Sequence, residues 1–122
     1  MKYYYNNQLI RTSKNHKYTH AVIARKEDGS IVCIACSSSE DGAIKAKKKE
    51  ASYYEQRIGN NEAAIAALKA GKSGYYYKDG RKTGYFKFEK DTTIEYYESS
   101  LADNQRTLNR INGWEIVELE ER

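Results

Sequence analysis

Two histidines and two cysteines are the side chains that could bind a metal ion in this sequence. His16 and His20 are separated by three residues and Cys33 and Cys36 form a C-x-x-C pair, which together are ligand types that zinc accepts. The cysteines, however, lie in the apolar run SIVCIACS, which is typical of a strand and not of a metal-binding turn. Strand residues three apart point to opposite faces. The pattern therefore predicts two separate structural thiols, with no metal site and no disulfide between them.

Two arginines provide the stronger chemical signal. Arg106 and Arg110 are four residues apart in NQRTLNRING, so on a helix both side chains lie on one face. Two guanidiniums placed this way can bind a phosphate or pyrophosphate through paired hydrogen bonds. Asp103 lies three residues before Arg106 and can pair with it, whereas no acidic residue lies three or four positions from Arg110. The alternative is an ordinary solvated helix face; Asn109 would add an amide to a binding site here.

Aromatic residues beside cations could complete a pocket for a nucleotide-like ligand. The segment GYYYKDGRKTGYFKFEK reads as a β-hairpin whose alternation sends Phe86 and Phe88 to one face. Aromatic rings near cations such as Arg11 can stack on a base while the cations hold its phosphates. Tyrosine runs also form good cross-strand pairs without any ligand. The candidate ligand-binding residues are Arg106, Arg110, Asn109, Phe86, Phe88 and Arg11.

No feature of the sequence indicates catalysis. It has no Gly-rich phosphate loop and no G-x-S-x-G elbow. A nucleophile formed by one of the cysteines with one of the histidines is chemically feasible, but no spacing favours it over buried thiols. We therefore expect no catalytic residues, no cofactor and no enzymatic activity.

Length and charge bound the class of protein. The 122 residues have a net charge of +4, which fits one domain (residues 1–122) and an anionic partner. The basic run KAKKKE falls inside a helical pattern and is typical of a solvated helix face, so nucleic-acid binding is not favoured. No apolar stretch approaches the ~20 residues of a membrane span, and the N-terminus lacks the apolar core of a signal peptide. We expect a soluble protein of a reducing, intracellular compartment.

The elements that must position these residues follow from turn residues. Residues 2–36 are predicted to form four strands in an antiparallel meander. Asn6 and Asn7 would turn the first hairpin, because asparagine tolerates a positive φ, and Asp28 and Gly29 would turn the second.

A long first helix is predicted after Ser38 or Ser39, either of which can cap its N-terminus. Gly71 would end it. Between these points a heptad register recurs at alternating spacings of three and four, formed by Ile44, Lys47, Ala51, Tyr54, Ile58, Asn61, Ile65 and Leu68.

A second helix is predicted after Asp91 or Thr92 and ends at Gly113. Its register is formed by Ile94, Tyr97, Leu101, Asn104, Leu108 and Ile111. The fold class is therefore α+β: an N-terminal antiparallel sheet, a long amphipathic helix, a β-hairpin, a second helix and a C-terminal strand.

Each helix carries one asparagine, Asn61 or Asn104, within its apolar seam. A buried polar seam residue costs stability but can fix register and partner number. Since one small sheet cannot easily cover so long a seam, we expect a homo-oligomer built along the helices. The alternative is that both helices pack on the protein's own sheet. On this reasoning Asn104→Leu should stabilise the helices or change the subunit number.

The order of these segments resembles a family of phage proteins. KYYYNNQLIRTS, a strand ending in SSS, a long helix, a Tyr/Phe-rich hairpin and the helix NQRTLNRING are similar to the anti-Thoeris sponge proteins of the first described type, from bacteriophages and prophages. The resemblance covers essentially the whole chain and concerns the order and composition of its segments.

The resemblance implies that the protein binds and sequesters a cyclic ADP-ribose isomer made by bacterial TIR enzymes, without cleaving it, in the host bacterial cytoplasm. It also implies a homo-oligomer with pockets shared between protomers and, in some members, a second site for other cyclic nucleotides. Arg106 and Arg110 would correspond to phosphate-binding arginines, and Phe86 to an aromatic that stacks on adenine. The competing interpretations are a small nucleic-acid- or protein-binding accessory factor of a mobile element and an enzyme that cleaves such a nucleotide.

Overall fold

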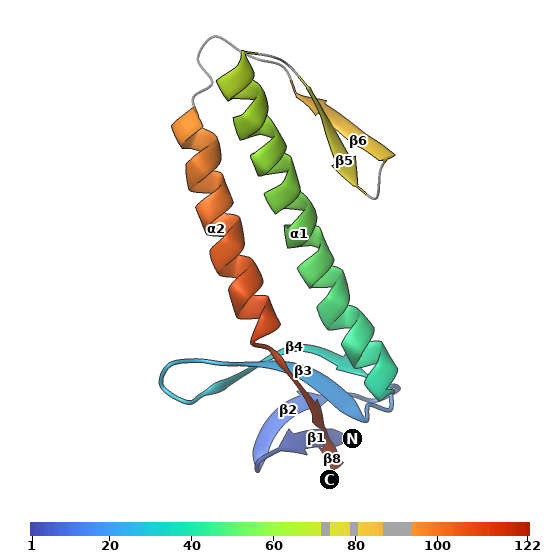
Figure 1. Cartoon of the computed structure of the whole chain (residues 1–122). Coiled ribbons are helices and arrows are strands. Elements are labelled where there is room, and N and C mark those ends of the chain that lie inside the picture. The colour runs from blue at the N-terminus through green and yellow to red at the C-terminus, as the bar shows by residue number, and fades with distance from the viewer. Residues whose placement is uncertain (72–73, 79–80, 87–93) are drawn as a thin grey trace. The chain divides into compact units, whose positions relative to one another are not determined.

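The computed structural model describes residues 1–71, 74–78, 81–86 and 94–122 (Figure 1). Its elements, in chain order, are β1 (Lys2–Tyr5), β2 (Gln8–Thr12), β3 (His20–Arg25), β4 (Ile31–Ser37), α1 (Glu40–Ala70), β5 (Gly74–Lys78), β6 (Arg81–Phe86), α2 (Ile94–Asn112), β7 (Glu115–Glu118) and β8 (Glu120–Glu121). The predicted α+β fold class is confirmed.

These elements form two compact units. Unit 1 contains Met1–Glu50 and Ile111–Arg122, and unit 2 contains Ala51–Arg110. Helix α1 contributes its first part to unit 1 and its second part to unit 2, and every strand except β5 and β6 belongs to unit 1. In the part of the chain that the structure describes, no helix combines the length and apolar composition needed to cross a membrane.

Both predicted N-terminal hairpins are confirmed by their turn geometry. Asn6 and Asn7 have φ values of 48° and 62° and join β1 to β2, and Gly29 has a φ of 85° between β3 and β4. The Asp28 carboxylate accepts hydrogen bonds from the backbone N–H and the hydroxyl of Ser30 at 2.9 and 2.6 Å. These bonds hold the pKa of Asp28 below its usual value, because they stabilise the charged carboxylate.

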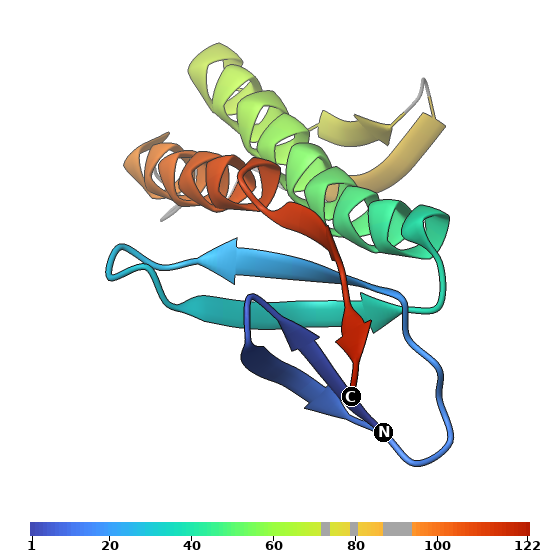
Figure 2. The ribbon, with the colours of Figure 1, turned by 90° about the horizontal axis from the view of Figure 1, so that it is seen from below.

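The predicted four-stranded meander is wrong, because the two hairpins belong to different sheets. One sheet has the order β2-β1-β8 and the other β4-β3-β7. The C-terminal segment, predicted as one strand, divides at Leu119, whose N–H donates to Thr19 O at 2.8 Å. Strand β7 then pairs with β3, and β8 pairs with β1 (Figure 2). The end of the chain therefore completes both sheets, which local hairpin signals cannot reveal.

Strand β3 is buried on both faces, which explains its nearly continuous apolar sequence HAVIAR. Ala21 and Ile23 have no exposed surface and form the core of unit 1 with Val117. Side chains from both sheets pack on this cluster: Tyr5, Ile10, Ile31, Cys33, Cys36 and Leu119. Val22, also buried, faces the other way and lines a shallow pocket with Ala46 of α1. Because side chains alternate along β3, the sheet β4-β3-β7 packs against the sheet β2-β1-β8 on one face and against α1 on the other.

Tyrosines of the first YYY run serve this packing. Tyr3 has no exposed surface, its hydroxyl donates to His16 O at 2.9 Å, and its ring meets Tyr18 edge to face at 5.5 Å. Tyr4 lies under the guanidinium of Arg122 at 4.5 Å. Each contact is internal to unit 1, so the run has a structural explanation without a ligand.

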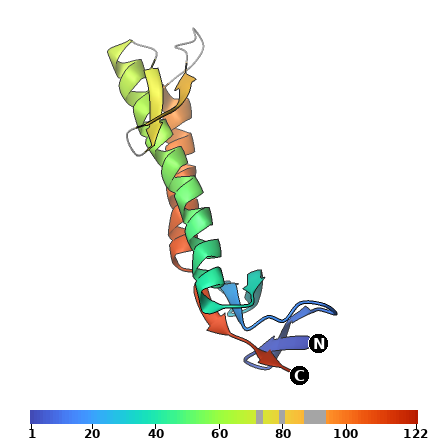
Figure 3. The same cartoon turned by 90° about the vertical axis from the view of Figure 1, so that its right-hand side faces the viewer.

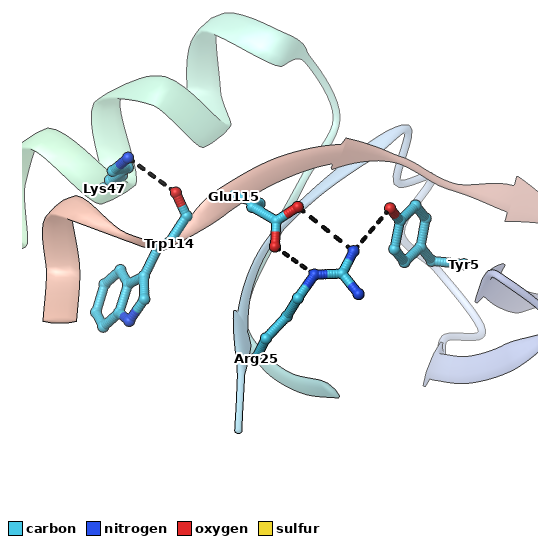
Figure 4. Close-up of polar contacts among 5 residues, drawn as sticks. All are labelled: Tyr5, Arg25, Lys47, Trp114 and Glu115. Carbon is cyan, nitrogen blue, oxygen red and sulfur yellow. Dashed lines mark hydrogen bonds and ion pairs between the residues drawn. The ribbon is translucent and has the colours of Figure 1, made fainter. Parts of the chain in front are cut away.

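Arg25 links the two sheets of unit 1 (Figure 4). Its Nε forms an ion pair with Glu115 of β7 at 2.5 Å, and its Nη2 donates to the hydroxyl of Tyr5 of β1 at 3.2 Å. Its guanidinium carbon also lies 5.9 Å from the centre of the Tyr5 ring. Because the pair with Glu115 is largely exposed, its main effect is to orient these groups and not to add stability.

Helix α1 has the predicted caps. Ser39 Oγ accepts a hydrogen bond from Gly42 N at 3.0 Å, and Gly71 adopts a φ of 69° just after the last turn. The predicted heptad register fails at the N-terminal end, where Ile44 is 43% exposed and Ala43 is buried. The first part of α1 packs on the sheet of unit 1. Its buried positions therefore do not continue the heptad register of the second part of α1.

In unit 2 the seam of α1 lies against α2, and the views of Figures 1 and 3 agree on this pairing. Asn104 Nδ2 donates to Asn61 Oδ1 at 2.7 Å, and Asn61 Nδ2 donates to Ser100 Oγ at 3.3 Å. Asn61 is 9% exposed and Asn104 is 5% exposed. The two apolar seams therefore pack against each other within the chain. This pairing explains the buried asparagines without a covering sheet or a second protomer.

Lys47, predicted at a seam position, instead caps the end of α2. Its Nζ donates to Asn112 O at 3.2 Å and to Trp114 O at 2.8 Å, the second of which is drawn in Figure 4. Carbonyls at a helix C-terminus have no partners within the helix, and a cation there is also attracted by the negative end of the helix dipole.

Lys47→Met is expected to destabilise unit 1 by about 1 kcal/mol, because two carbonyls lose a charged donor while the apolar stem is kept. Thermal unfolding followed by Trp114 fluorescence measures this change. Lys48→Met is the matched control, since it removes the same charge from an exposed neighbouring position. Equal melting temperatures for both variants would contradict the capping role.

Candidate ligand-binding site

The predicted cationic face of α2 is present. Arg106, Asn109 and Arg110 are all exposed, and Arg106 forms an ion pair with Asp103 as its spacing predicts. Arg110 donates from Nη2 to the hydroxyl of Thr107 at 3.3 Å. Among the residues whose side chains are described, no carboxylate pairs with Arg110. The positive charge of Arg110 is therefore available to an anion, whereas the charge of Arg106 is already paired with Asp103.

Arg57 on α1 is a cation that sequence reasoning missed. Its Nε donates to Asn104 Oδ1 at 3.2 Å and its Nη1 donates to the Tyr53 hydroxyl at 2.9 Å. The guanidinium carbon lies 5.5 Å from the centre of the Tyr53 ring. These neutral partners hold the guanidinium in place, and within the described side chains it has no acidic partner. The Tyr53–Arg57 spacing of four residues on a helix was the signal that could have revealed the pair.

Asn60 adds an acceptor near this position. Its Oδ1 is buried and receives no hydrogen bond from any described residue. Asn60 lies three residues after Arg57, so both side chains leave the same side of α1. A buried acceptor without a donor costs about 1–3 kcal/mol. Unit 2 therefore offers cations from both helices, Arg57 of α1 and Arg110 of α2, and carries one buried amide oxygen without a described donor.

The remaining predicted residues are placed less fully. Phe86 ends β6, but its side chain lies outside the described part of the structure, and Phe88 lies outside the described residues altogether. The second-helix caps predicted at Asp91 or Thr92 also fall outside them. The aromatic platform proposed from the second tyrosine segment thus stays a prediction.

Arg11 belongs to unit 1, where it has partners of its own. Its guanidinium carbon lies 5.7 Å from the centre of the Tyr18 ring. Partial burial alone would lower the pKa of Arg11, but attraction by Cys36, Tyr18 and Cys33 raises it above its usual value. Arg11 is therefore a firmly charged residue between a tyrosine and two thiols, and its role in binding a nucleotide stays a prediction.

The prediction that Cys33 and Cys36 point to opposite faces is wrong. Their Sγ atoms lie 3.6 Å apart and both are partly buried. The register of β4 against β3 shifts between Val22 and Ile23, so one residue of β4 is extra and the alternation reverses. Over the described residues, no three side chains of His, Cys, Asp or Glu converge as they would around a metal ion.

Comparisons with protein-family models, with curated protein sequences and with solved structures find no match to this chain.

Proposed function

We propose that this protein binds and sequesters a cyclic ADP-ribose isomer without cleaving it, in the cytoplasm of the host bacterium. The observation that supports this best is that unit 2 presents Arg57 and Arg110, whose described partners are all neutral. A pyrophosphate carries the negative charge that such cations attract, and guanidiniums bind phosphate oxygens through directed hydrogen bonds. The resemblance to anti-Thoeris sponge proteins, which is one of segment order, points to the same ligand.

Sequestration needs a different site from catalysis. A cyclic ADP-ribose isomer combines a pyrophosphate with an adenine and two riboses, so it calls for cations, an aromatic platform and amides. Arg57 and Arg110 supply cations, and the exposed Asn109 supplies an amide. Tight binding then depends mainly on slow release. Pockets shared between protomers would slow it further, and we keep the homo-oligomer as part of this proposal.

The exposed side chains of the helices support an assembly. Tyr53 of α1 and Tyr96 of α2 are 53% and 67% exposed, which makes them the largest exposed apolar side chains of unit 2 described here. Aromatic residues are enriched at protein interfaces. Light scattering of the purified protein would give the subunit number, and a monomer mass at all concentrations would contradict this part of the proposal.

The test mixes the purified protein with a cyclic ADP-ribose isomer, removes unbound ligand by filtration, heats the retained protein and separates the released material by chromatography. We expect intact ligand in near-stoichiometric amount. A cleaved product would show an enzyme instead. If nothing is retained, the proposal fails, and binding of an oligonucleotide that falls steeply with salt would favour the nucleic-acid interpretation.

Arg110→Ala is expected to weaken ligand binding by about 10- to 100-fold, because a charged hydrogen bond is lost. Arg106→Ala should have a smaller effect, since Arg106 is already paired with Asp103, and the double variant should abolish binding while the oligomer persists. Calorimetry measures the affinities. Lys69→Ala removes one exposed charge from the same unit and serves as the control; an equal loss in that variant would indicate a general charge effect and no defined site.

A further inference from the structure

The bulge in β4 brings two thiols together in unit 1. Ala35 pairs with Val22 and Cys33 pairs with Ile23, which leaves Ile34 as the extra residue. The side chain of Ile34 is 38% exposed, while Cys33 and Cys36 both turn toward the core cluster. Without the bulge, a spacing of three residues would separate the sulfurs across the strand. With it, they lie 3.6 Å apart.

The backbone around the bulge also suits a bond between these sulfurs. Cys33 pairs with Ile23 and Cys36 with Ala21, and residues two apart on a strand are separated by about 6.6 Å along it. The two cysteines therefore occupy adjacent positions on one face of β4, and their sulfurs, now 3.6 Å apart, would close to about 2.05 Å in a disulfide.

The surroundings favour oxidation over metal binding. The two sulfurs have no third ligand of the usual kinds among the described residues, and the guanidinium of Arg11 lies close enough to interact with both thiols. A fixed positive charge repels a metal cation, whereas it stabilises the thiolate that starts thiol–disulfide exchange and so offsets part of the effect of burial.

We infer that Cys33 and Cys36 form a reversible dithiol–disulfide pair that a low-molecular-weight disulfide oxidises. One cysteine thiolate attacks the external disulfide, releases one reduced thiol and leaves a mixed disulfide on the protein. The second cysteine then attacks that mixed disulfide, forms the Cys33–Cys36 bond and releases the second reduced thiol. Two electrons pass to the external disulfide, and the two thiol protons end on the two released thiols.

Burial and the hydrogen bond with Cys33 raise the pKa of Cys36 to about 11. Because the thiolate is the attacking species, oxidation should be slow at neutral pH and should accelerate as the pH rises toward 11. The disulfide would fix β4 at its bulge, and a closed loop this short is expected to raise the melting temperature of unit 1 by a few degrees.

The test incubates the full-length protein with oxidised and reduced glutathione in varied ratios, blocks free thiols with an alkylating reagent and measures the intact mass. We expect the protein to lose two hydrogens and to carry neither alkyl groups nor glutathione once oxidised glutathione dominates. Cys33→Ser and Cys36→Ser should instead accumulate a stable glutathione adduct on the remaining cysteine.

A variant with two cysteines on opposite faces is the matched control. Ala35 lines the pocket on the side of β4 that faces α1, so combining Ala35→Cys with Cys36→Ala keeps two cysteines but separates their faces. That variant should form glutathione adducts and no internal disulfide. The inference is overturned if the unaltered protein keeps two alkylated thiols under conditions that load glutathione onto the single-cysteine variants, or if the control forms the internal bond equally well.

Discussion

Tyr3→Ala is expected to lower the free energy of unfolding of unit 1 by about 3–5 kcal/mol, the range for removing a fully buried aromatic side chain. Tyr3 has no exposed surface and lies in β1, the middle strand of its sheet. The substitution removes the ring that packs on Tyr18 and leaves His16 O without its donor. Because domains of this size are stable by only about 5–15 kcal/mol, the variant should be close to unfolding. Urea titration followed by fluorescence of Trp114, the single tryptophan, reports on unit 1.

Two neighbouring substitutions make this prediction specific. Tyr3→Phe keeps the ring and loses only the hydrogen bond to His16 O, so a loss of about 1 kcal/mol is expected. Tyr4→Ala removes the same side chain from a partly exposed position under Arg122 and should cost clearly less than Tyr3→Ala. If Tyr3→Ala and Tyr4→Ala unfold at the same urea concentration, the buried role of Tyr3 is wrong.

Asn104→Leu is expected to destabilise unit 2 by about 1–3 kcal/mol, because it leaves the Asn61 amide buried without its main partner. The same change also removes the oxygen that accepts from Arg57. The seam pattern alone predicts the opposite sign, since leucine is normally the better residue at an apolar seam position. The difference arises because the two asparagines satisfy one another within the chain. Thermal unfolding followed by helical circular dichroism measures the effect.

The double variant Asn61→Leu with Asn104→Leu separates the pair from its surroundings. Replacing both partners by apolar groups can be nearly neutral, so the double variant should recover most of the stability that either single variant loses. The double-mutant cycle should therefore show a large coupling energy between Asn61 and Asn104. Additive losses would contradict the Asn61–Asn104 hydrogen bond, and light scattering of all three variants would reveal any change in subunit number.

Local signals in the sequence predicted the elements well and their partners less well. Asn6, Asn7, Gly29 and Gly71 adopt the positive φ values that their residue types favour, because turn and cap chemistry involves neighbours in sequence. The division of the two hairpins between two sheets depends on β7 and β8, which arrive from the other end of the chain. No residue of the first hairpin encodes which strand will pair with β1 on its far side.

The candidate site shows the same division. Helical spacing predicted that Arg106 would pair with Asp103 and that Arg110 would lack an acidic partner on its own helix, because both expectations involve one helix; among the described side chains, Arg106 pairs with Asp103 and Arg110 contacts Thr107. Arg57 escaped notice, since its importance depends on Asn104 from another helix. The thiols were predicted incorrectly because a bulge of one residue reverses the alternation of a strand. That reversal depends on how β4 pairs with β3 and leaves no reliable mark on residues 31–37 themselves.

The way in which the C-terminal strands complete unit 1 has a consequence for folding. Arg25 and Glu115, which meet on neighbouring strands, are 90 positions apart in the chain, so closing that loop precedes most of the stabilising contacts between them. High contact order of this kind slows folding. During synthesis, β1 and β3 expose unpaired edges until residues 115–121 leave the ribosome, and exposed edges invite aggregation. A chain cut short before Glu115 should therefore precipitate or be degraded in cells, even though it keeps every residue of the candidate ligand site in unit 2.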